Sequence, residues 1–77
     1  MKNHNSSEIV RYLYVCSKLT YEEMSKITNI KIDTLANWIT GRRNPPIYVV
    51  EGIYPKMKKF LSPDEQRIAG DMIKGDN

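Results

Sequence analysis

Apolar residues recur at helical spacing along most of the chain, and polar interruptions divide it into short helices. The first helix is predicted to follow a polar leader at residues 1–5, with Ser6 or Ser7 as its amino-terminal cap, and to end near Ser17 or Lys18. Its inward stripe has i, i+4, i+7 spacing and comprises Ile9, Leu13 and Cys16, with Val10 alongside.

Two more helices are expected on either side of a short break that contains no glycine or proline. Thr20 and Glu23 have the spacing of a capping box, which predicts a second helix ending near Thr28. Asn29 follows, and asparagine accepts the left-handed conformation found at helix ends, so it can take the place of a glycine. A third helix is expected over residues 32–40. Its inward side is predicted to comprise Leu35, Trp38 and Ile39.

The carboxyl-terminal half predicts two further helices after a rigid Asn-Pro-Pro turn. The apolar spacing of residues 47–54 favours a fourth helix, which Pro55 either kinks or ends. The final helix, at residues 63–74, has the strongest local signal, because Ser62 precedes a proline and an acidic residue stands at the third position. Its stripe comprises Ile68, Ala69, Met72 and Ile73.

These elements predict an all-α fold, a compact bundle of four to five short helices in one domain over residues 6–77. The chain has 77 residues, of which 40% are hydrophobic and 27% are charged, the balance of a small globular domain. No apolar run is long enough for a spanning helix, and the leader lacks the apolar core of a signal peptide. A cytoplasmic protein is expected.

Residues that would carry catalytic or metal chemistry are scarce. The single cysteine, Cys16, is predicted to be a small core residue, and the single histidine, His4, lies in the polar leader. Zinc needs three or four clustered ligands, and no nucleophile stands near a candidate base. We therefore expect no metal, no cofactor and no enzymatic activity.

Basic residues are concentrated in the middle of the chain. Residues 31–59 contain six basic and two acidic residues, whereas the whole chain has a net charge of +3. This distribution suits a polyanionic partner, and the alternative is a basic face that is merely solvated.

Two short helices joined by a tight turn form a helix-turn-helix pattern at about residues 20–41. The stretch 19–45 resembles the DNA-binding core of the Cro and phage-repressor-like (XRE-type) family, which often has Leu-Thr-x-Glu-Glu at one end and Trp-x-x-Gly-x-Arg-x-Pro at the other. The matching residues are Leu19, Thr20, Glu22, Glu23, Trp38, Gly41, Arg43 and Pro45. The resemblance implies a lambda-repressor-like bundle whose third helix enters the major groove of DNA.

The same resemblance implies two groups of DNA-contacting residues. The residues implied to contact base edges are Ile32, Asp33, Thr34 and Asn37. The residues implied to contact phosphates are Tyr21, Lys31, Arg42, Arg43 and Asn44. Asn37 is the strongest candidate for base readout, because an amide pairs with adenine at two points, whereas Asp33 has the alternative of favouring the amino end of its own helix. Trp38 is expected to pack between helices, and core-edge positions are expected for Tyr12, Tyr14, Tyr48 and Tyr54.

The function implied is a sequence-specific transcriptional regulator of the repressor or Cro kind that binds double-stranded DNA. A homodimer is expected on DNA, because one small domain covers one half-site. Its candidate surfaces are Met72 and Ile73 of the last helix, and residues 47–54. The alternative for the last helix is that it only closes the core of its own domain. The alternative is a helix-turn-helix scaffold reused as a protein-binding adaptor or small phage-type inhibitor.

Overall fold

The computed structural model describes residues 5–75, and these form an all-α globule without strands. The predicted leader residues 1–4, with His4, and the last two residues lie outside the described part. The elements are α1 (Ser6–Ser17), α2 (Tyr21–Thr28), α3 (Ile32–Ile39), α4 (Ile47–Met57), a 3₁₀ turn η1 (Lys58–Phe60) and α5 (Pro63–Lys74). The all-α prediction of four to five short helices is confirmed.

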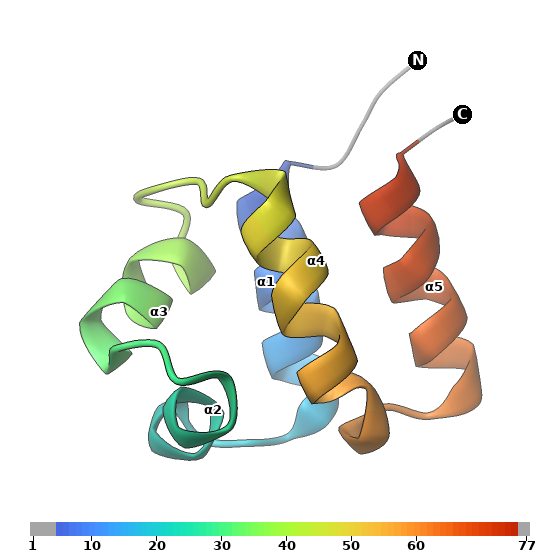
Figure 1. Ribbon diagram of the computed structural model, residues 1–77, viewed down its shortest axis with the longest axis horizontal. Coiled ribbons are helices and arrows are strands. Elements are labelled where there is room, and N and C mark those ends of the chain that lie inside the picture. The colour runs from blue at the N-terminus through green and yellow to red at the C-terminus, as the bar shows by residue number, and fades with distance from the viewer. Residues whose placement is uncertain (1–4, 76–77) are drawn as a thin grey trace.

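Helix α1 lies at the centre of the bundle and contacts α3, α4 and α5. Helices α2 and α3 lie on one side of it and α5 on the other, with α4 in front of α1 in the view of Figure 1. Helix α2 contacts α3 and α4, so both helices of the predicted helix-turn-helix pack against other helices of the bundle. This arrangement leaves the outer side of α3 facing away from the remaining helices.

One hydrophobic core unites all five α-helices. Its buried members are Ile9, Val10, Leu13, Met24, Leu35, Ile39, Val50, Ile53, Met57, Leu61 and Ala69. Cys16 and Trp38 are partly buried and pack against the edge of this core. The stripe predicted for the last helix is wrong at Ile68, which is 40% exposed, and Ile47 at the start of α4 is 43% exposed as well. Ala69, the residue after Ile68, is fully buried, so Ile68 lies at the edge of the stripe.

Three capping boxes begin α1, α2 and α5, so the amino ends of these helices are fixed by local hydrogen bonds. The predicted boxes at Thr20 and Ser62 are confirmed. For α1 the predicted cap is wrong, because Asn5 takes that position and its side chain accepts from the backbone N–H of Glu8 at 2.9 Å. The backbone N–H of Ser62 donates to Glu65 Oε1 at 2.8 Å, which lowers the pKa of Glu65.

Pro55 does not end α4, which continues to Met57. Proline removes the backbone donor to the carbonyl four residues earlier, here that of Glu51. Both Pro55 and Glu51 are exposed, so water can satisfy this carbonyl and the helix tolerates the residue. The chain then tightens into η1 before the cap of α5.

The helices of the described chain are short. The longest, α1 and α5, have 12 residues each, and none within residues 5–75 has the length and apolarity to cross a membrane.

Candidate nucleic-acid interface

The turn between α2 and α3 spans Asn29–Lys31, and local hydrogen bonds fix its shape. Asn29 adopts the left-handed conformation, with φ 61° and ψ 36°, as predicted. Its backbone N–H donates to the carbonyl of Ser25 at 2.7 Å, and that of Ile30 donates to the same carbonyl at 3.3 Å. The Ser25 hydroxyl in turn donates to the carbonyl of Ile30. The direction in which α3 leaves the turn is therefore set by the backbone.

Helix α3 has one buried face and one open face. Leu35 and Ile39 point into the core. The open flank holds the residues predicted for base readout together with the turn lysine. Of these, Lys31, Ile32 and Asp33 are exposed, and Thr34 and Asn37 are half-buried.

The polar side chains of this flank are uncommitted within the described chain. No hydrogen bond or ion pair inside residues 5–75 engages the side chains of Lys31, Asp33, Thr34 or Asn37. Lys31 is the amino-terminal cap residue of α3, and no side chain caps the helix there. The alternative role of Asp33 as a capping residue therefore has no hydrogen bond to support it, although its place in the first turn still favours a negative charge.

The loop after α3 folds back onto that helix and carries the two adjacent arginines. Gly41 has a φ of 86°, and its N–H donates to the carbonyl of Trp38 at 3.2 Å. The N–H of Arg43 donates to the carbonyl of Asn37, also at 3.2 Å. Arg42 and Arg43 are exposed, and no ion pair within the described residues engages them. The loop thus places two exposed arginines just after the carboxyl end of α3.

Helix α1 supplies further bonds to the carboxyl end of α3, which the sequence did not indicate. The Ser7 hydroxyl donates to the carbonyl of Trp38, and Arg11 Nε donates to the carbonyl of Ile39 at 2.9 Å. The N–H of Ser7 donates to Asn44 Oδ1 at 2.9 Å. Asn44, predicted as a phosphate ligand, therefore uses its amide oxygen to tie the loop to α1.

The aromatic residues are mostly structural. Tyr21, the remaining predicted phosphate ligand, is half-buried, and its ring centroid lies 5.0 Å from that of Tyr14. Tyr12 and Tyr54 are also partly buried against the core, as predicted. Tyr48 departs from the prediction, because it is 71% exposed on the outer side of α4.

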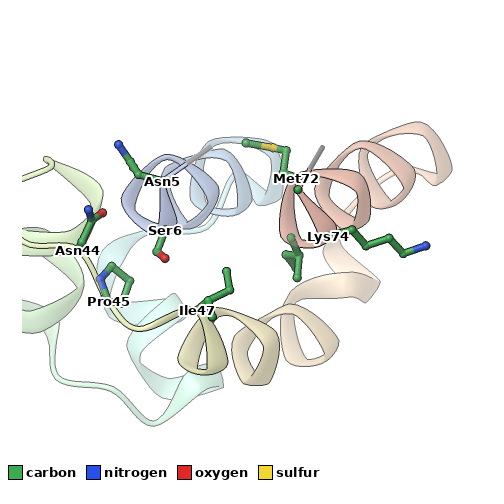
Figure 2. Close-up of a pocket in the computed structure, with 9 residues that line it drawn as sticks. Asn5, Ser6, Asn44, Pro45, Ile47, Met72 and Lys74 are labelled. Carbon is green, nitrogen blue, oxygen red and sulfur yellow. The ribbon is translucent and has the colours of Figure 1, made fainter. Parts of the chain in front are cut away.

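The residues predicted for dimerisation line a hollow away from the open face of α3. Met72 and Ile73 are half-buried there, and Ile47 faces them from α4. Figure 2 shows residues of α1, α4 and α5 around this hollow, which has a volume of about 420 Å³. Pro45 and Asn44 extend it toward the arginine loop.

The only described cysteine is not poised for chemistry. Cys16 lies on α1 near Glu65 of α5, and burial raises the pKa of its thiol. Burial, and then a hydrogen bond with Cys16, raises the pKa of Tyr12. Across residues 5–75, no three histidine, cysteine or acidic side chains lie close enough together to hold a metal ion.

Comparison with known proteins found no matching family model, no similar curated protein and no similar solved structure. The function of this chain is therefore inferred from its own residues and their geometry.

Proposed function

We propose that this protein is a sequence-specific regulator that binds double-stranded DNA through α3, in the manner of Cro and phage-repressor-like proteins. One observation carries the proposal. The uncommitted polar flank of α3 lies beside a loop that carries two exposed arginines, and the backbone of Arg43 in that loop is bonded to Asn37 of the same helix. This surface therefore offers a polyanion both positive charge and polar groups that are not already hydrogen-bonded.

The two parts of this surface have different tasks in the proposal. Arg42, Arg43 and Lys31 bind phosphates, which supplies affinity and register without sequence information. Asn37 and Thr34 reach base edges, because they lie on the open flank of α3, and an amide pairs with adenine in two-point fashion. Ile32 contributes apolar contact with a thymine methyl group, and Asp33 accepts from a cytosine amino group.

A homodimer completes the proposed regulator. Two half-sites about one DNA turn apart, roughly 34 Å, are the usual target of such helices. The hollow between α4 and α5, with Met72, Ile73 and the exposed Ile47 around it, offers apolar surface to a second copy.

The proposed setting is the cytoplasm, and both repression and activation are compatible with this mode of binding.

Selection of bound sequences from a random DNA duplex pool tests the proposal. We expect a two-fold symmetric motif, which would establish DNA reading and dimerisation together. Arg43→Ala should weaken binding to all duplexes by a similar factor and reduce the slope of log K against log salt by about one unit. Asn37→Ala should instead lower the discrimination between bases at one position of the site, by about 1–3 kcal/mol. Weak duplex binding that neither substitution changes would contradict DNA recognition.

A protein-binding adaptor is the second candidate, and one observation favours it. Ile32 is 38% exposed at the start of α3, next to the acidic Asp33. An apolar and acidic pair suits a protein surface better than a negatively charged groove. The adaptor predicts that Ile32→Ser abolishes binding to a protein partner, whereas Arg43→Ala does not affect that binding.

A further inference from the structure

We propose that Arg11, in the first helix, is an additional phosphate-binding residue of this interface. The inference rests on the proposed DNA-binding function and adds a residue from outside the helix-turn-helix. Arg11 lies thirty residues before the arginine loop in sequence, and the fold brings the two together.

The position of Arg11 is fixed by α3 itself. Its Nε donates to the carbonyl of Ile39 at 2.9 Å, at the carboxyl end of the helix. A Cβ built on Gly41 would lie 3.6 Å from Arg11 Nη2, so the guanidinium runs alongside the residue that precedes Arg42. The Arg11 guanidinium therefore lies beside the start of the loop that carries Arg42 and Arg43.

The remaining donors of Arg11 are available to a ligand. A guanidinium has five N–H donors, and the bond to Ile39 uses the one on Nε. Arg11 is exposed, and no ion pair with a carboxylate engages it within residues 5–75. The fork formed by its terminal nitrogens matches two phosphate oxygens, and because the stem is anchored, less side-chain entropy is lost on binding.

The electrostatic setting favours an anion beside Arg11. Arg11 lies next to the loop that holds two further positive charges, so a phosphate bound there meets positive charge from two segments of the chain. The partial negative charge at the carboxyl end of α3 offsets part of this positive charge in the absence of ligand. A phosphodiester that bridges Arg11 and the loop is therefore the ligand that this geometry fits.

The salt dependence of duplex binding separates a phosphate contact from a structural role. Arg11→Gln is expected to reduce the slope of log K against log salt by about one unit, as expected when one phosphate contact is lost. Arg11→Lys keeps the charge and should keep most of that slope while lowering affinity, because lysine lacks the fork. Arg67→Gln is the matched control, since it removes an exposed arginine of α5, on the opposite side of α1 from α3 (Figure 1). Thermal unfolding of each variant reports whether the fold persists.

The outcomes are distinguishable. If the slope for Arg11→Gln changes no more than that for Arg67→Gln, while Arg43→Ala still reduces it, Arg11 does not bind phosphate although the proposed function stands. If Arg11→Gln does not fold, Arg11→Lys decides: a slope that falls by a full unit in this variant, despite the retained charge, overturns the assignment. A wild-type protein without salt-dependent duplex affinity overturns the assignment together with the proposed function.

Discussion

Within residues 5–75, two residues other than glycine hold the left-handed conformation at helix ends, and exchanging each for glycine measures what the conformation costs. Lys18 ends α1 with φ 62°, and Asn29 ends α2 with φ 61°. Both side chains are exposed, and no hydrogen bond to either appears within the described residues. The Gly variants therefore change mainly the backbone preference, at two sites of nearly equal geometry.

The expected magnitudes differ between the two sites. An L-residue in this conformation costs about 1–2 kcal/mol, and glycine avoids this cost but loses about 0.5–1 kcal/mol through its greater freedom in the unfolded chain. Lys18→Gly should therefore raise the free energy of unfolding by about 0.5–1 kcal/mol. Asparagine tolerates the conformation better than lysine, so Asn29→Gly should raise it by less than about 0.5 kcal/mol.

Urea and thermal unfolding, followed by circular dichroism at the helix band, measure these differences. A gain of about 0.5–1 kcal/mol corresponds to an increase in Tm of roughly 2–8 °C for a domain of this size. The charge of Lys18 contributes slightly to the lowered pKa of Glu65, so Lys18→Gly would also remove a weak charge attraction. The two variants are therefore compared in about 1 M salt, where attractions between exposed charges are screened. Equal gains at the two positions, or a loss at Lys18, would refute the reasoning.

Three further predictions concern the core, α4 and the thiol. Met24→Ala should lower the free energy of unfolding by about 2–5 kcal/mol in urea titration, because Met24 is fully buried; a loss below about 1 kcal/mol would argue against this packing. Gly52→Ala should raise the free energy of unfolding by about 0.5–1 kcal/mol, since nothing lies within 4 Å of an added Cβ in the middle of α4, and a loss of stability would show hidden crowding. Because burial raises the pKa of Cys16, less thiolate is present at pH 8, and mass spectrometry should show slower alkylation in the folded protein than in urea; equal rates would contradict the prediction.

Features fixed by neighbouring residues were predictable from the sequence. The capping boxes at Thr20 and Ser62 need only a hydroxyl and an acidic residue three positions later, so their residue types reveal them. Asn29 was predictable in the same way, because few residues accept a left-handed backbone. The sequence places the cap of α1 one or two residues too late, at Ser6 or Ser7, since Asn5, Ser6 and Ser7 are all good caps and only the fold chooses among them.

Features fixed by tertiary contacts were not predictable. The apolar spacing places Ile68 on the stripe of the last helix, but how much of that stripe is covered depends on how the helices cross. The bonds from Ser7 and Arg11 to the end of α3 span about thirty residues, and periodicity carries no information about such pairs. For the candidate interface, the sequence located α3 and the arginine loop, but it could not reveal that Asn44 is bound to α1.

The bonds from α1 to the end of α3 mean that the α2–α3 segment cannot be moved alone to another protein with its shape intact. If residues 19–46 were excised or grafted onto another scaffold, the carbonyls of Trp38 and Ile39 would lose the donors that Ser7 and Arg11 provide. The amide oxygen of Asn44 would lose its donor as well. A transplant that preserves the shape of this segment must therefore carry the first helix with it.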